Sequence, residues 1–207
     1  MIISAGDSLV WGSELADCRG STYDRFSKST FFANLSTDSD YFSIAYPALT
    51  NRQIASRIED AINIVLTKST QHINPQPKET YGGLAIPSIT DCAIKLVTAK
   101  SVAFVVCWTW PSRDNELHSN DAIQSTEQLL KQHSIPYLFT CADSCVITDS
   151  LDLTNWALFP GQIGFYQWAT TNKYLCGPQA HPLEQAHQDA ARLLQGKFNE
   201  LVKKFVQ

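Results

Sequence analysis

A serine near the start of the chain and a histidine near its end have the residue types that nucleophilic catalysis requires. Ser8 stands in the stretch Gly-Asp-Ser-Leu at residues 6–9, and His181 stands in Pro-Gln-Ala-His-Pro at residues 178–182. A serine hydroxyl attacks well when a neighbouring base takes its proton and when hydrogen-bond donors stabilise the oxyanion that forms. The two residues are far apart in sequence, so this chemistry requires a fold that brings them together.

Four short apolar stretches are predicted to be the strands of a parallel sheet. They are residues 1–5, 41–45, 101–107 and 135–140, and the continuous apolar character of 101–107 is typical of a central strand covered on both faces. Strands that alternate with helices indicate an α/β fold, here a three-layer α/β/α sandwich with a flavodoxin-like sheet of order 2-1-3-4-5. Ligands bind at the switch point of such a sheet, and Ser8 follows the strand that ends there.

Helical periodicity predicts the elements that cover the sheet. A helix is expected over residues 51–68, with Thr50 or Asn51 as its N-cap, another over 120–133, and a last one that opens with Pro182 at position N1 and ends near 205. Short helices are also expected at 30–35 and 91–98. The inward face of the last helix is predicted to consist of Ala186, Ala190, Leu193, Leu194, Phe198 and Leu201.

The length of 207 residues fits one domain that carries two insertions. Residues 69–90 contain Pro75, Pro77 and Pro87, and we expect either a lid or binding loop or a surface insertion. Residues 143–177 are aromatic and rich in turn residues, which predicts irregular structure and short helices. The aromatic side chains there could stack on sugar rings or could belong to the core.

Charge and composition exclude several classes of partner. The net charge of -4 and the pI near 5.7 give no electrostatic reason to expect nucleic acid or an anionic membrane as a partner. No apolar run approaches the roughly 18 residues that a membrane span needs. The first residues lack the features of a signal peptide, so we expect a cytoplasmic protein, or a virion-associated one if the chain is viral.

The distribution of cysteines and histidines gives no reason to expect a cofactor or a metal. The six cysteines are scattered and form no CxxC pair, which is typical of free buried thiols in a reducing compartment. His187 follows His181 by six residues and has no third ligand in sight. Dinucleotide-binding, Walker and Gly-x-Ser-x-Gly motifs are missing.

The stretch at residues 6–9 resembles the signature of the SGNH, or GDSL, hydrolases, and the order of later blocks is similar to that family over most of the chain. The resemblance implies that Ser8 is the nucleophile and that His181, which precedes a proline and the last helix, is the general base. Ala48 stands where the family has a glycine whose N–H enters the oxyanion hole. Thr109 stands where the family has an asparagine donor. The expected oxyanion donors are therefore Ser8, Ala48 and Thr109.

The block around His181 departs from the family pattern at the residue that should orient the histidine. Pro178 occupies the position of the family's aspartate. Gln179, a backbone carbonyl, or a more distant acid such as Asp143 or Asp152 remain as candidates. A base held in the wrong tautomer costs up to about 10⁴-fold in rate.

The resemblance implies a serine esterase that removes acyl groups, often acetyl, from carbohydrates or lipids, and a polysaccharide ester is the first expectation. The alternative is a degenerate SGNH fold that acts as a glycan-binding or structural module, for example on a virus particle. The departures at Ala48, Thr109 and Pro178 favour that alternative. Arg113, in the loop after the central strand, could contact substrate or could be an exposed loop residue.

Overall fold

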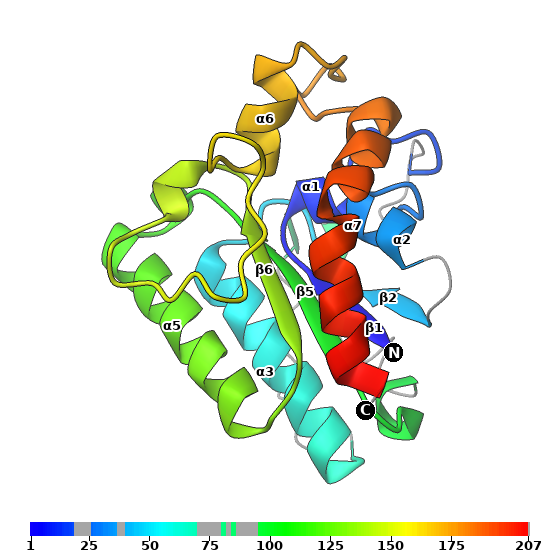
Figure 1. The fold of residues 1–207 in the computed structure, drawn as a ribbon, viewed down its shortest axis with the longest axis vertical. Coiled ribbons are helices and arrows are strands. Elements are labelled where there is room, and N and C mark those ends of the chain that lie inside the picture. The colour runs from blue at the N-terminus through cyan, green and yellow to red at the C-terminus, as the bar shows by residue number, and fades with distance from the viewer. Residues whose placement is uncertain (19–25, 37–39, 70–79, 82–83, 86–94, 207) are drawn as a thin grey trace.

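A parallel four-stranded sheet forms the centre of the protein (Figure 1). The computed structural model describes residues 1–18, 26–36, 40–69, 80–81, 84–85 and 95–206. The strands are β1 (Ile2–Ala5), β2 (Tyr41–Ser43), β5 (Ala103–Trp108) and β6 (Tyr137–Cys141), in the order β2-β1-β5-β6. All three strand pairs are parallel. The expected α/β architecture is confirmed, and β1 lies between β2 and β5.

The place of the expected fifth strand is taken by a single bridge in the described part of the chain. The N–H of Phe139 donates to the carbonyl of Asn155, and the N–H of Ala157 donates to the carbonyl of Phe139, both at 2.8 Å. Trp156 forms the resulting parallel bridge. Tight turns on either side keep the extended segment short, so the prediction of five strands is corrected to four strands and a bridge.

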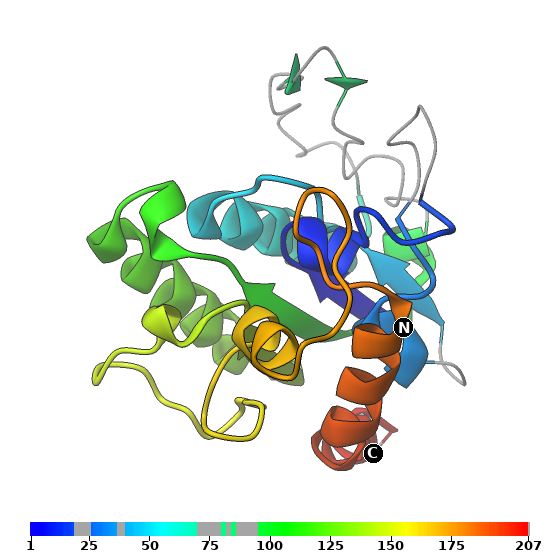
Figure 2. The same cartoon turned by 90° about the horizontal axis from the view of Figure 1, so that it is seen from above.

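Helices cover both faces of the sheet (Figures 1 and 2). On one face, α3 (Asn51–Thr67) packs against α5 (Glu116–Gln132). On the other face, α2 (Phe31–Leu35) packs against α7 (Glu184–Val206). This double coverage explains why every residue of β1 and β5 is buried.

The helices at 51–68 and 30–35 are confirmed nearly to the residue. Thr50 and Gln53 form a capping box at the start of α3, in which each side chain accepts from the other's backbone N–H. Thr30 caps α2 through a 3.3 Å hydrogen bond from the Ala33 N–H. Of the helix expected at 91–98, residues 95–98 are described and are helical.

Three details of the later helices differ from expectation. Helix α5 begins at Glu116, ahead of the predicted start, because the Asn115 side chain caps it. Helix α7 begins at Glu184, since Pro182 lies in an antiparallel bridge with Cys176 instead of at position N1. Leu193 is 50% exposed and does not belong to the inward face.

The two predicted insertions differ in how much of them is described. Within 69–90, β3 (Thr80–Tyr81) and β4 (Leu84–Ala85) pair antiparallel, and most of the remainder lies outside the described residues, where the predicted lid or loop falls. Within 143–177 the side chains of Trp156, Phe159, Phe165 and Trp168 are buried in the core, and those of Tyr166 and Tyr174 are half-buried against it. The remaining short helices are α1 (Ser8–Trp11), η1 (Pro111–Arg113), η2 (Ser144–Val146) and α6 (Phe165–Thr171).

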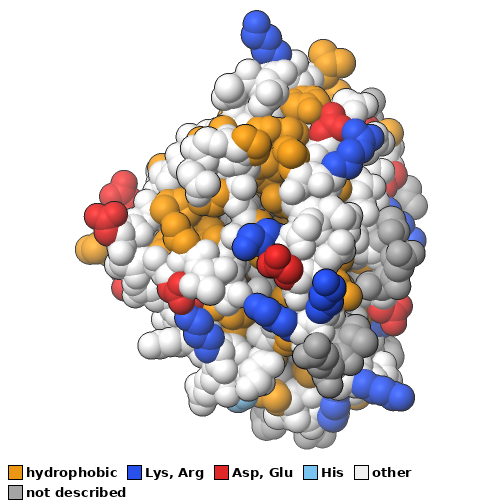
Figure 3. Space-filling view, in the orientation of Figure 1, with side chains coloured by type: hydrophobic (Ala, Val, Ile, Leu, Met, Phe, Trp, Pro, Cys, Tyr) orange, Lys and Arg blue, Asp and Glu red, His pale blue; other side chains and the backbone are white. Residues whose placement is uncertain are grey.

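Figure 3 shows one face of the surface. Lys and Arg side chains lie there among acidic and uncharged ones, and hydrophobic side chains gather in patches on its upper half. Within the described chain, no helix combines the length and apolar character that crossing a bilayer demands.

Candidate active site

Ser8 lies at the carboxyl end of β1, where the chain turns sharply into α1. The turn passes through Gly6, where a Cβ atom would lie 2.5 Å from Val10 Cγ2 and 2.9 Å from the Cys107 carbonyl oxygen. Only glycine fits this close approach of backbone and neighbouring strand. Because β1 lies between β2 and β5, Ser8 occupies the switch point that the strand order predicts.

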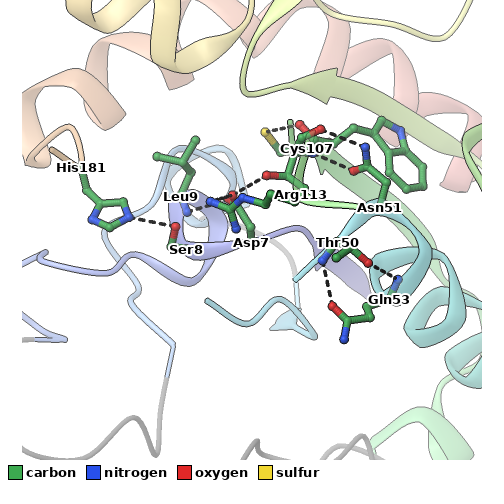
Figure 4. A network of polar contacts seen from close by, with 11 residues as sticks. Asp7, Ser8, Leu9, Thr50, Asn51, Gln53, Cys107, Arg113 and His181 are labelled. Carbon is green, nitrogen blue, oxygen red and sulfur yellow. Dashed lines mark hydrogen bonds and ion pairs between the residues drawn. The ribbon is translucent and has the colours of Figure 1, made fainter. Parts of the chain in front are cut away.

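The buried side chain of Asp7, the residue before Ser8, holds the turn in place through three contacts. Its Oδ1 accepts from the Leu9 N–H at 3.0 Å and caps α1. Its Oδ2 accepts from the Thr109 hydroxyl at 2.8 Å and lies 3.2 Å from the Arg113 guanidinium (Figure 4). A fully buried carboxylate is thereby paired and hydrogen-bonded, and it joins β1 to the loop after β5.

Arg113 is part of this network, which settles its place in the fold. Its side chain keeps 29% of its surface exposed, and its guanidinium lies 5.4 Å from the centre of the Trp110 ring. Trp110 in turn packs edge-on against Tyr166. The arginine is therefore exposed, as one of the two expectations had it, but it is also a partner of Asp7 and of an aromatic side chain.

Thr109, which the family resemblance makes an oxyanion donor, is held by three hydrogen bonds. Its N–H donates to Asn51 Oδ1 at 2.8 Å, and its carbonyl accepts from Asn51 Nδ2 at 2.9 Å. Its hydroxyl carries one proton, and that proton goes to Asp7. Thr109 therefore joins the start of α3 to the turn that carries Ser8, and in this conformation its hydroxyl proton points to Asp7.

His181 lies within hydrogen-bonding distance of Ser8, although 173 residues separate them. The distance from His181 Nε2 to Ser8 Oγ is 2.8 Å (Figure 4). The loop that carries His181 is closed by the Gly177 N–H on the His181 carbonyl, at 2.9 Å, and by the Leu183 N–H on the Leu175 carbonyl, at 3.0 Å. This is the geometry in which an imidazole can take the proton of a serine.

The other ring nitrogen of His181 contacts Glu14, a residue that sequence reasoning missed. His181 Nδ1 lies 2.9 Å from Glu14 Oε2, and the backbone N–H groups of Gln179 and His181 donate to the same carboxylate. Burial raises the pKa of Glu14, but these hydrogen bonds outweigh it, so the pKa lies below its ordinary value. The carboxylate is held in its charged form.

The candidates named for this position lie elsewhere or contact differently. Asp143 caps η2 through the Cys145 N–H, and Asp152 pairs with Lys131. Gln179 contributes its backbone N–H to Glu14, and does not itself orient the imidazole. The one sequence signal for Glu14 is Gly12, which ends α1 in a left-handed conformation and turns the chain back toward Ser8.

Ala48 has the backbone conformation that a glycine would favour. Its φ of 65° lies in the left-handed region, and the residue is exposed in the loop after β2. The same loop is tied to the nucleophile turn, since the Tyr46 N–H donates to the Gly6 carbonyl at 3.2 Å. Ala48 thus adopts a backbone conformation that glycine favours, although it carries a methyl group.

His187 is a buried structural residue. Its Nδ1 accepts from the Phe31 N–H at 3.1 Å, a hydrogen bond joins it to the Pro182 backbone, and its ring stacks on Phe31. Burial lowers its pKa from 6.5 to about 3, so the ring is neutral in the folded protein. Among the described residues, no three His, Cys, Asp or Glu side chains are grouped to hold a metal ion.

The buried neutral ring of His187 predicts a loss of stability in mild acid. Below pH 6.5 the imidazole of the unfolded chain is protonated, whereas the imidazole of the folded protein stays neutral down to about pH 3. Lowering the pH through this range should therefore decrease the free energy of unfolding, by about 1.4 kcal/mol per pH unit. Urea unfolding at several pH values measures it, with His187→Gln as the comparison. An equally steep loss in that variant would contradict the prediction.

Comparison with known proteins supports the fold and goes no further than the fold. The structure of this chain is similar to the crystal structure of a carbohydrate esterase family 2 enzyme with its carbohydrate-binding domain, from Corynascus thermopiles (Myceliophthora fergusii). The TM-score is 0.51 at 13% identity, over 98% of this chain and 66% of that one. No family model and no curated protein matches the sequence. The chain thus has an α/β fold consistent with the flavodoxin-like SGNH architecture, and it spans 66% of the length of that enzyme chain.

Proposed function

We propose that the chain is a serine esterase of the SGNH type that hydrolyses an acyl ester on a carbohydrate. The observation that carries the proposal is the 2.8 Å contact between Ser8 Oγ and His181 Nε2 at the switch point of a parallel sheet. The carbohydrate esterase among the structural neighbours supports the substrate class. Nothing in the proposed reaction calls for a metal or a cofactor.

The proposed reaction is acyl transfer in two steps. Ser8 Oγ attacks the ester carbonyl while His181 Nε2 takes its proton. The imidazolium then gives that proton to the sugar oxygen as its bond to the carbonyl carbon breaks, and the sugar departs with a free hydroxyl. A water molecule, deprotonated by the same imidazole, attacks the acyl-enzyme and releases the acid. Ser8 is regenerated with its proton.

The proposed oxyanion donors are the backbone N–H groups of Ser8 and Ala48. The left-handed backbone of Ala48 and the tie between its loop and the nucleophile turn support this role. Thr109 is left out, because its hydroxyl proton is used by Asp7. One donor fewer costs about 10²- to 10³-fold in rate, so we expect slower turnover than with a complete oxyanion hole.

A small acyl group, in the first place acetyl, fits the surroundings of the nucleophile. Ser8 exposes only 5% of its surface, and His181 covers it from the far end of the chain. Little room is therefore left beside the reacting hydroxyl in this conformation. We expect the hydrolysis rate to fall as the acyl chain of the substrate is lengthened.

An ester assay on matched proteins tests the proposed function. Release of acetate from p-nitrophenyl acetate and from acetylated oligosaccharides is measured for the wild type and for Ser8→Ala. Turnover by the wild type, reduced to near background in the variant, is the expected result. Equal rates from both proteins, or none from either, would contradict it. Glycan binding by both proteins without turnover by either would favour the degenerate binding module instead.

A further inference from the structure

We infer that Glu14 is the positioning residue of the site, so that the acid which orients His181 comes from the segment that carries the nucleophile. This inference rests on the proposed function for its catalytic meaning. The SGNH resemblance places the acid three residues before the histidine, and that position is Pro178. The carboxylate instead reaches the ring from the other side, six residues after Ser8.

The contacts of the imidazole ring define which nitrogen holds the proton. A charged carboxylate accepts and cannot donate, so the nitrogen that faces Glu14 Oε2 must carry hydrogen. That leaves the lone pair of Nε2 directed at Ser8 Oγ, 2.8 Å away. This is the tautomer that a general base needs, and Glu14 also stabilises the imidazolium formed after proton transfer.

The fold of residues 8–14 delivers Glu14 to the histidine. Helix α1 lasts one turn, and the N–H groups of Gly12 and Ser13 both donate to the Ser8 carbonyl at 3.0 Å. Gly12 then reverses the chain with φ 84°, and Glu14 follows with φ 71°, a conformation that side-chain-bearing residues rarely adopt. A tolerated outlier of this kind at a contact with the base fits a functional constraint.

The loop of residues 177–181, which carries His181, surrounds the carboxylate of Glu14 closely. The Gln179 N–H donates to both Glu14 oxygens, at 2.9 and 3.1 Å, and the His181 N–H donates to Oε2 at 3.1 Å. A Cβ atom on Gly177 would lie 2.5 Å from Glu14 Cδ and Oε1. Only 13% of the Glu14 side chain is exposed. Keeping the Glu14 carboxylate in this position therefore requires glycine at 177. The backbone N–H groups of Gln179 and His181 and the His181 ring hold the carboxylate there.

Other titratable groups near the pair do not take over this role. The pKa of the Cys176 thiol is raised by burial and by Glu14, so the thiol is neutral, and His187 is neutral because it is buried. Glu184 holds the same segment from α7 by accepting the Ala16 N–H at 2.6 Å, and it is not among the hydrogen-bonding partners of the His181 ring. Glu184 therefore offers a matched control for simple anchoring.

The test compares Glu14→Gln with Glu184→Gln through kcat, KM and the pH profile of ester hydrolysis. We expect Glu14→Gln to lower kcat by up to about 10⁴-fold with little change in KM. The acid limb of kcat/KM should move to lower pH, because the carboxylate that favours a positive charge on the ring is gone. Glu184→Gln should leave the profile in place. Gly177→Ala should reproduce the loss although Glu14 is still present.

Two results would overturn the inference. One is a Glu14→Gln enzyme with wild-type kcat and pH profile, whatever its stability, which would reduce Glu14 to an anchor of the loop. The other comes from nitrogen-15 NMR of the wild-type histidines, which requires no variant and no turnover. In the neutral form of the His181 ring, a proton on Nδ1 and none on Nε2 is expected, and the opposite tautomer contradicts the inference. Because this readout is independent of ester hydrolysis, it separates a failed inference from a failed proposed function.

Discussion

Replacing His181 by glutamine is expected to lower kcat for acetyl ester hydrolysis by about 10⁴- to 10⁶-fold. The reason is that Nε2 of His181 is the base in contact with the Ser8 hydroxyl, at 2.8 Å, and an amide does not accept that proton at neutral pH. KM should change little, because the lost interaction acts on proton transfer and not on substrate binding. Initial rates with p-nitrophenyl acetate at neutral pH provide the measurement.

The matched control for this variant is His133→Gln. His133 is exposed and caps the end of α5, remote from the carboxyl ends of the strands. The control enzyme should therefore keep its rate. A His181→Gln enzyme as fast as the His133→Gln enzyme would remove the histidine from the mechanism.

Replacing Asp7 by alanine is expected to lower the free energy of unfolding by about 3 kcal/mol. The substitution removes the cap of α1 and leaves the Thr109 hydroxyl, which is buried, without its acceptor. It also leaves Arg113 without its carboxylate, although partial exposure of the guanidinium moderates that loss. Equilibrium urea unfolding, followed by tryptophan fluorescence and by circular dichroism, gives the difference.

Asp114→Ala is the control for loss of an ion pair at the surface. Asp114 lies 3.7 Å from Arg52, whose side chain is 60% exposed. Screening by water limits such a pair to about 1 kcal/mol or less. If both variants lost the same small amount, the Asp7 network would not stabilise the turn that carries Ser8.

The sheet and the position of Ser8 follow from the sequence for a simple physical reason, and the pairing of Ser8 with His181 follows from the resemblance to the SGNH family. Parallel strands place their carboxyl ends at one edge, so a motif directly after the first strand must lie at the switch point. The block order then places His181 ahead of a helix that covers the same sheet. The structure brings the two side chains to 2.8 Å, and their catalytic roles remain a proposal.

The residues that sequence reasoning missed depend on tertiary contacts. Glu14 reaches His181 only because Gly12 and Glu14, on either side of Ser13, both adopt left-handed conformations, which no local pattern specifies. Thr109 matches a family position, yet the buried carboxylate of Asp7 competes for its only proton. The missing fifth strand reflects turns around Trp156 that shorten an otherwise apolar segment.

The departures from the family pattern have unequal consequences in the structure. The change to Pro178 is compensated, because Glu14 occupies the second nitrogen of the histidine. At Ala48 the backbone is left-handed, a conformation that glycine favours. The hydroxyl of Thr109 donates to Asp7. Under the proposed function, the site would transfer the serine proton through His181 and Glu14 and would rely on backbone donors for the oxyanion.

Covalent trapping decides whether Ser8 is the nucleophile. The protein is mixed with p-nitrophenyl acetate, and the reaction is quenched with acid during the first turnovers. After proteolytic digestion, the mass of the peptide that contains Ser8 is measured by mass spectrometry. We expect one acetyl group on Ser8 in the wild type, a larger trapped fraction when deacylation is slowed, and none in Ser8→Ala. An enzyme that turns over with its acetyl group on another residue, or equally well without Ser8, would contradict the proposed mechanism.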